Sequence, residues 1–436
     1  MMTYNSLPAS WGKISLTDDL IFVKPGVDKY GGEKEYFSTG SIQADSKSPV
    51  GSYTYLNRPS RANRISRDGD VFQARMKNTN KALLIDKTLD SKLFSTGFFQ
   101  IRPDPQIING RYIFYYLNST IFHKAKDELC TGSTQEALNN TNAKNIIIPI
   151  PPIREQYRIV EKIEELFSEI DKGIEYLQIA KGQLEVYRQA VLKAAFEGKL
   201  TGVAEGNGWE KCTLNDFAVE IRTGPFGTLL KKSDHRNHGT PVIGIENICK
   251  GKFIGGNNIF VDKELAEKLA AYSVKADDVI ISRSGTVGEL CRVPPGWDSS
   301  LISSNLIKLS LDTRKVNPEY FVMLFQSKGI IYDQIKKLIK GSTRVFLNQK
   351  ILKSIIFLIP SLEEQHLIVQ EIESRLSVCE YMEETIAKRL AQAESLKQSI
   401  LKKAFEGRLV PQNLDDEPAA ILLKRIRKKK KKQKKA

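Results

Sequence analysis

Two stretches of the chain share a helical pattern of apolar positions. From residue 153 to residue 196 there is no proline, and apolar residues recur at alternating spacings of three and four. The first seam consists of Val160, Ile163, Phe167, Ile170, Ile174, Leu177, Leu184 and Val191, interrupted by Lys181 and Arg188. The second consists of Val369, Ile372, Leu376, Cys379, Ile386, Leu390, Ala393 and Ile400, interrupted by Glu383 and Lys397. These spacings predict two long helices with coiled-coil seams.

Local signals mark where each helix begins and ends. Prolines at 151–152 precede the first helix, Ser361–Glu364 has the form of a capping box before the second, and Gly198 and Gly407 follow the last turns. A helix of about 44 residues is roughly 66 Å long, and its seam needs a partner. We expect the two helices to pack antiparallel about a pseudo-twofold axis; the alternative is that each lies on its own globular domain.

The chain also repeats itself. GSTQEALN at 132–139 returns as GSTRVFLN at 341–348, and the same shift of 209 aligns 28 identical residues among the 69 positions from 132 to 200. Upstream the copies diverge, although Trp11 still aligns with Trp209, Asp70 with Asp278 and Arg75 with Arg283. One unit is therefore used twice, with a variable part of about 150 residues followed by a conserved part of about 50.

The variable parts contain short apolar runs that end in turn residues. PVIGIENI at 241–248 and DDVIISRSGTVG at 277–288 predict strands, whereas 112–118 and 318–326 predict helices. We therefore expect mixed α/β (α+β) heads with irregular sheets plus long α-helices. The predicted divisions are a first head at 1–150, a first helix at 151–202, a second head at 203–359, a second helix at 360–412 and a basic tail at 413–436.

Composition and charge limit the possible functions. The chain has 436 residues, 41% of them hydrophobic, which suits two or three folded domains. Its net charge is +15, but residues 424–435 hold ten basic side chains and no acid, which leaves about +5 for the rest. Such a run is typical of a disordered arm attracted to nucleic acid or another polyanion; a merely solubilising tail is the alternative.

Cysteine usage and targeting signals suggest an intracellular protein. Five cysteines at least 37 residues apart offer neither a disulfide framework nor a zinc clamp, so we expect buried small side chains. His235 and His238 lie close together without a third ligand, and no metal is predicted. No run of about 18 uncharged apolar residues and no secretory signal is present, so we expect a cytoplasmic protein without membrane contact.

Several segments together resemble the specificity subunit of a type I restriction-modification system. They are the helix entries IPIPPIREQ and IPSLEEQ, the exits AFEGKL and AFEGRL, RTGPFGTLLKKSD at 222–234, VIISRSGTVG at 279–288, and the closing DEPAAILLKRIR. The first head departs from the pattern, because QARMKNTN at 73–80 stands where RSGTVG would be expected.

The resemblance implies that each head is a target recognition domain that reads one half of a bipartite, asymmetric site in double-stranded DNA. It implies that the helix pair sets the spacer and, with the conserved ends of the heads, docks two modification (methyltransferase) subunits. The chain itself would be non-catalytic and without cofactor. S-adenosylmethionine would belong to the modification subunits, and ATP and Mg to motor-nuclease restriction subunits.

The residues themselves agree with a non-catalytic role. Neither a GxxxxGK[ST] phosphate loop nor a GxGxxG fingerprint occurs, and NPEY at 317–320 reads as a helix start, like NGRY at 109–112. Two other classes stay open. A stand-alone nucleic-acid-binding scaffold would bind DNA without modification subunits, and an enzyme with two catalytic heads would need matching reactive groups. Asp70 and Asp278, the shared acids, read as turn residues.

Candidate DNA contacts lie in loops rich in Gly, Ser, Thr, Arg and Lys, because phosphates need exposed donors and base edges need side chains that reach into a groove. The candidates are Arg75, Lys77, Gly132, Ser133, Thr134, Gln135, Lys231, Lys232, Arg283, Ser284, Thr286, Gly341, Ser342, Thr343 and Arg344. Since Gly-Ser-Thr is identical in both copies, it suits phosphate binding or helix capping. Gln135 and Arg344 follow it at equivalent positions, which suggests adenine readout by one and guanine readout by the other.

Overall fold

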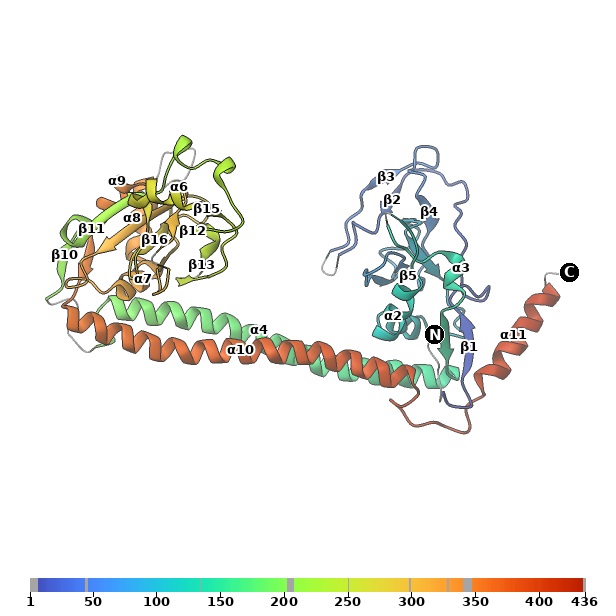
Figure 1. Ribbon diagram of the computed structural model, residues 1–436. Coiled ribbons are helices and arrows are strands. Elements are labelled where there is room, and N and C mark those ends of the chain that lie inside the picture. Colours follow the sequence, from blue (N-terminus) through green and yellow to red (C-terminus); the bar gives the residue numbers. More distant parts are fainter. Residues whose placement is uncertain are drawn as a thin grey trace. The chain divides into compact units, whose positions relative to one another are not determined.

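The computed structural model describes residues 7–43, 46–133, 135–201, 208–249, 251–297, 299–327, 329–339 and 347–433 (Figure 1). The chain forms two compact units, one of residues 1–177 with 388–436 and the other of residues 178–387. Both divisions fall inside long helices. Each unit therefore contains one head and the adjoining parts of both helices.

In its described residues, head 1, which belongs to the first unit, is built from short strands and three helices. Its strands are β1 (Gly12–Ser15), β2 (Lys34–Phe37), β3 (Gly51–Tyr53), β4 (Ala62–Ile65), β5 (Val71–Ala74), β6 (Ala82–Leu84), β7 (Leu93–Ser95), β8 (Phe98–Ile101) and β9 (Ile147–Ile150), and its helices are α1 (Gly110–Leu117), α2 (Thr120–Glu128) and α3 (Asn140–Ala143). The strands form sheets in the orders β3-β2-β7-β4, β6-β5-β8 and β1-β9. This is the mixed domain with irregular sheets that the sequence predicts.

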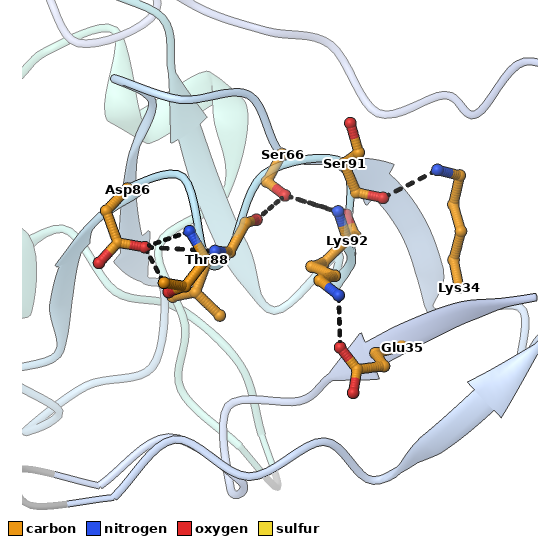
Figure 2. A network of polar contacts seen from close by, with 8 residues as sticks. Lys34, Glu35, Ser66, Asp86, Thr88, Ser91 and Lys92 are labelled. Carbon is orange, nitrogen blue, oxygen red and sulfur yellow. Dashed lines mark hydrogen bonds and ion pairs between the residues drawn. The ribbon is translucent and has the colours of Figure 1, made fainter.

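The turn between β6 and β7 is held by a network of polar contacts (Figure 2). The Asp86 carboxylate accepts hydrogen bonds from the backbone N–H groups of Thr88 and Leu89 at 3.0 and 3.2 Å. The Ser66 hydroxyl accepts from the backbone N–H of Lys92 at 3.0 Å, and the Lys92 ammonium lies 2.6 Å from a Glu35 carboxylate oxygen. These contacts hold both ends of the segment between β6 and β7.

Head 2, in the second unit, has more irregular elements. In chain order they are β10 (Glu210–Cys212), α5 (Leu214–Phe217), β11 (Ala218–Thr223), η1 (Gly227–Leu229), η2 (Lys232–Asp234), β12 (Thr240–Ile243), η3 (Ile245–Asn247), β13 (Ile248–Cys249), β14 (Lys252–Phe253), β15 (Phe260–Val261), α6 (Lys263–Lys268), η4 (Ala270–Tyr272), β16 (Val279–Ser282), β17 (Leu290–Arg292), β18 (Leu301–Ile302), β19 (Leu306–Leu311), α7 (Pro318–Gln326), α8 (Ile330–Ile339), α9 (Gln349–Lys353) and β20 (Phe357–Ile359). The sheet β11-β19-β16-β17 forms its centre, and β10 pairs with β20 as β1 pairs with β9. The predicted strand at 241–248 ends early, because a 3-10 turn interrupts it.

The long helices are α4 (Ile153–Phe196) and α10 (Leu362–Phe405), each of 44 residues. Their predicted apolar seam residues are buried or half-buried. Three of the polar breaks find partners across the seam, since Arg188 lies 3.4 Å from Glu383 in the second unit and Lys397 pairs with Asp171 in the first, whereas Lys181 is exposed. In the first unit Ile163 lies in the same core cluster as Leu401, and further along α4 Asp171 pairs with Lys397. In the second unit Arg188 pairs with Glu383, and further along α4 Ala195 lies in the same core cluster as Ile372. The helices are therefore antiparallel within each unit.

The helix ends follow the predicted signals with one difference. Gly198 and Gly407 have φ values of 74° and 73°, as expected for residues that end a helix in the left-handed region. The Ser361 hydroxyl accepts the backbone N–H of Glu364 at 3.3 Å. The Glu364 carboxylate, however, accepts the indole N–H of Trp209 at 3.2 Å and so ties head 2 to the helix.

A last helix, α11 (Ala419–Gln433), carries most of the basic tail. The charge pattern predicts a disordered arm, but the structure forms a helix whose Ala419, Leu422, Leu423 and Ile426 are buried against head 1. Their i, i+3, i+4, i+7 spacing gives one apolar face, which explains the helix. Three of the five cysteines are buried as predicted, whereas Cys212 is half-buried and Cys249 is exposed.

Candidate DNA interface

In head 1 the structure brings two predicted loops together. The backbone N–H of Lys77 donates to Glu136 O at 3.0 Å, and that of Leu138 donates to Arg75 O at 2.9 Å. The Lys77 ammonium lies 2.7 Å from the Glu136 carboxylate. Hydrogen bonds and an ion pair therefore hold the loop around Gly132 against residues 75–77, which follow β5. A side chain at Gly132, with φ 145°, would lie 2.3 Å from a backbone carbonyl oxygen, so glycine is required there.

Arg75 has several partners inside head 1. Its guanidinium carbon lies 3.8 Å from the centre of the Phe99 ring, and it donates to Phe98 O at 3.2 Å and to the Asn140 side chain at 2.9 Å. Burial lowers the pKa of Arg75 to about 10. These contacts make Arg75 an anchor for the loop, and any phosphate contact would use its remaining donor capacity. Ser133 and Gln135 are exposed beside it.

Head 2 repeats this arrangement around Arg283. The backbone N–H of Leu347 donates to Arg283 O at 3.1 Å, as Leu138 does to Arg75. The guanidinium carbon of Arg283 lies 4.7 Å from the centre of the Phe226 ring, and burial lowers the pKa of Arg283. The equivalence of Arg75 and Arg283 is thus structural: each stacks on an aromatic ring where a buried strand ends.

Phe226 belongs to the loop that also carries Lys231 and Lys232, both exposed. Gly224 brings this loop close to the neighbouring chain, because a side chain there would lie 1.9 Å from Ser303 O. Ser284 donates to the Asn305 side chain at 2.9 Å, and Thr286 is exposed nearby in sequence. Phe226 and Arg283 therefore join the two predicted loops of head 2. Thr134 and the segment Gly341, Ser342, Thr343 and Arg344 lie outside the described residues.

Sequence reasoning did not assign the residues that fasten each head to its helix. The Gln156 side chain accepts the backbone N–H of Asn109 at 2.8 Å and donates to Ile107 O and Pro151 O, both at 2.9 Å. Gln365 accepts the N–H of Asn317 at 2.8 Å and donates to Lys315 O and Pro360 O, both at 2.9 Å. Both amides are fully buried. The sequence offered one indication of this role, because the Glu-Gln pair at 155–156 is identical to the pair at 364–365.

Each fastening point stands beside an equivalent hollow. In the first unit a hollow of about 940 Å³ is lined by Asp68, Asp86, Arg111, Tyr157, Glu161 and Glu164, among others. In the second unit a hollow of about 350 Å³ is lined by Asp277, Arg292, Asn317, His366, Val369 and Glu373, among others. The repeat register aligns Tyr157 with His366 and Glu164 with Glu373. Acidic side chains outnumber basic ones in both, which disfavours contact with DNA phosphates.

The two heads also use their aligned acids alike. Asp70 accepts the backbone N–H of Arg67 at 2.9 Å, and Asp278 accepts that of Lys275 at 2.7 Å, three residues upstream in each case. Asp70 also pairs with Arg102 at 2.7 Å, and Asp278 accepts the Ser310 hydroxyl at 2.6 Å. Both carboxylates therefore stabilise a turn, as the sequence indicates. NGRY and NPEY are helix starts, with Asn109 and Asn317 as the caps of α1 and α7.

Comparison with known proteins accounts for the duplicated architecture. The family model for the type I restriction modification DNA specificity domain matches residues 28–177 and again 206–392. The chain belongs to this family. As a type I specificity subunit it is the DNA-recognition component of such a system and not a catalytic one. None of the helices in the described ranges is long and apolar enough to cross a bilayer.

Relatives of the specificity subunit extend over most of its length. The StySPI specificity subunit of Salmonella potsdam is 26% identical over 344 residues, which cover 75% of this chain and 73% of the relative. The EcoBI specificity subunit of Escherichia coli is 25% identical over 349 residues, which cover 73% and 71%. The HsdS subunit of Thermoanaerobacter tengcongensis has a similar fold, with a TM-score of 0.54 at 21% identity over 93% of this chain and 98% of that subunit.

A second solved structure, from work on complex assembly and conformational transition of a type I restriction-modification system, has a TM-score of 0.75. It is 22% identical and covers 93% of this chain and 100% of that chain. These likenesses show that two mixed heads with a long helix pair are the fold of the specificity subunit.

Proposed function

We propose that each head of this specificity subunit reads one half of a bipartite, asymmetric site in double-stranded DNA. The observation that carries the proposal is that the loops around Arg75 in head 1 and Arg283 in head 2 are held in the same way. Arg75 and Arg283 occupy equivalent positions against an aromatic ring, while the loops that follow them differ in sequence. A constant frame with variable loops suits two readers of different sequences.

The proposed contacts divide by chemistry. Lys77, Lys231 and Lys232 suit backbone phosphates, because an ammonium group is a point charge without base selectivity. Gln135 and Arg344 suit base edges, since amide and guanidinium groups form paired hydrogen bonds with adenine and guanine. The remaining contacts are proposed through the hydroxyl and backbone N–H groups of Gly132, Ser133, Thr134, Ser284, Thr286, Gly341, Ser342 and Thr343.

The junction between head and helix occurs twice in the chain, which suggests two equivalent binding places for partner subunits. We propose that two modification subunits dock at the helix pair and at the conserved ends of the heads, with motor-nuclease subunits completing the complex. The two equivalent acidic hollows support this, because one partner surface could meet both. The partners would bring S-adenosylmethionine, ATP and Mg, and the helix pair would set the spacer between half-sites.

Sequencing of methylated adenines in the host genome, with and without this gene, tests the function. Loss of one bipartite methylated motif on deletion of the gene, and its return on complementation, is the expected result. Sequence-specific binding by the isolated chain with no change in the methylome would instead favour a stand-alone DNA-binding scaffold. Unchanged methylation together with absence of specific binding would overturn the proposal.

A further inference from the structure

Helix α11 joins the end of the chain to the first strand of head 1 (Figure 1). The backbone N–H of Ala419 donates to Ser10 O at 2.9 Å. A side chain at Gly12 would lie 2.7 Å from the Leu423 side chain, so the helix rests directly on β1. Arg427 adds an ion pair with Asp18 at 2.6 Å. The helix therefore packs on head 1 through its apolar face, and the Arg427–Asp18 ion pair adds a polar contact beside that face.

The apolar face ends at Ile426, but the helix continues to Gln433. The added turns contain five consecutive lysines, at 428–432, which we call the cationic segment. Lys428 and Lys429 are exposed and form no ion pair with any described residue. The two arginines before them are already paired, Arg425 with Glu417 at 2.8 Å and Arg427 with Asp18. Lys428 and Lys429 therefore carry positive charge without an acidic partner just beyond the docked face.

Such a segment is an unfavourable helix by itself. Lysines three and four positions apart repel, at a cost of about 0.2 to 0.5 kcal/mol for each such pair. The docked turns before it supply the helical start, and a polyanion along the exposed side would remove the repulsion. Duplex DNA presents one phosphate charge per about 1.7 Å of its axis, a density that matches consecutive lysines.

Helix α11 belongs to the first unit, and its apolar residues lie in the core of head 1. Both heads share the Trp–Glu contact at the helix, with Trp11 donating to Glu155 at 3.0 Å and Trp209 to Glu364 at 3.2 Å. Within the described residues, no helix beyond the two repeats packs on the core of head 2, whereas head 1 has the docked α11 with its cationic extension.

We propose that the cationic segment of α11 binds backbone phosphates on the DNA flank next to the half-site read by head 1, and not on the other flank. This inference rests on the proposed function. The segment is about 7 Å long and so covers roughly two to four base pairs. Successive lysines point in directions about 100° apart, so two or three of the five can reach one duplex, and they would steepen the salt dependence of binding by a log–log slope of about 2 to 3.

Hydroxyl-radical footprinting of the full chain with its modification subunits, on a duplex containing the methylated motif, tests the proposal. Replacing Lys428, Lys429, Lys430, Lys431 and Lys432 by glutamine should shorten protection by two to four base pairs on one flank only. The salt slope should fall, and protection of both half-sites should remain. Shortening on both flanks, or on neither, would overturn the inference.

A matched pair of substitutions separates docking from charge alone. Leu423→Asp places a carboxylate in the buried face and should release α11, which removes the one-sided protection although every lysine is kept. Ile421→Asp changes net charge equally on the same helix, but Ile421 is 54% exposed, so protection should persist. If the Leu423→Asp variant still protects the flanking DNA, docking of α11 is irrelevant and the inference fails. If the chain without substitutions protects neither half-site, that result would contradict the proposed function instead.

Discussion

The buried amide of Gln156 allows a quantitative test of how a head is fastened to its helix. Gln156→Leu keeps a similar volume but removes one acceptor and two donors. The backbone N–H of Asn109 and the carbonyls of Ile107 and Pro151 then lose the fully buried side chain that binds them. The expected consequence is a less stable first unit.

The magnitude follows from the number of hydrogen bonds. Each contributes about 0.5 to 1.5 kcal/mol net, and a buried group left without a partner costs about 1 to 3 kcal/mol. Three bonds therefore predict a loss of about 3 kcal/mol in the free energy of unfolding. For a folding unit of 150 to 250 residues, this corresponds to a fall in Tm of about 6 to 12 °C.

Calorimetry combined with hydrogen exchange provides the assay. The unfolding transition of the first unit should move down, and the amide of Asn109 should exchange faster in peptides that contain it. Gln106→Leu is the control, since Gln106 is exposed in the same unit and its substitution should change stability by less than about 0.5 kcal/mol. Gln365→Leu should repeat the effect in the second unit. Equal stability of Gln156→Leu and Gln106→Leu would refute the fastening role.

Three further predictions address pH, spacing and readout. Burial, then the nearby Lys126, lowers the pKa of His123 to about 4. Because the folded state favours neutral His123, stability should fall by up to about 3 kcal/mol as pH decreases from 6.5 to 4, and urea unfolding of His123→Leu should lack this slope. Four residues inserted before Ala194 add roughly 6 Å of helix; methylome mapping should show a spacer longer by one or two base pairs, and an active complex with the old spacer would exclude the helix as a ruler. Arg344→Gln should relax one guanine of one half-site or change it to adenine, whereas uniformly weaker methylation of the same motif would assign Arg344 to the backbone.

Much of the fold was accessible from local sequence because the decisive interactions are local. The bounds of α4 follow from the absence of proline, the seam spacing and Gly198. The helix starts at Asn109 and Asn317 follow from capping, in which a side chain binds a backbone N–H two or three residues ahead. The repeat identified the equivalent helices, because residues that pack in the same way stay similar while loops diverge.

The candidate site was only partly predictable. The loop sequences indicated where polar groups gather, but they did not indicate that Phe99 and Phe226 would stack on Arg75 and Arg283. Those aromatic rings come from segments distant in sequence, so no local pattern links them. The choice of Arg75 as a DNA contact stays a prediction, although its internal partners give it a packing role as well.

Because helical periodicity and capping act within a few residues, the repeat, the two antiparallel helices and the division into constant and variable parts can be predicted from sequence alone. The roles of the constant residues emerge with the folded structure. It made Gln156 and Gln365 into fasteners, paired Arg188 with Glu383, and converted an expected disordered tail into a helix docked on Gly12. The physical reason is burial: a polar or cationic side chain acquires its role from the groups that enclose it, and folding brings those groups from elsewhere in the chain.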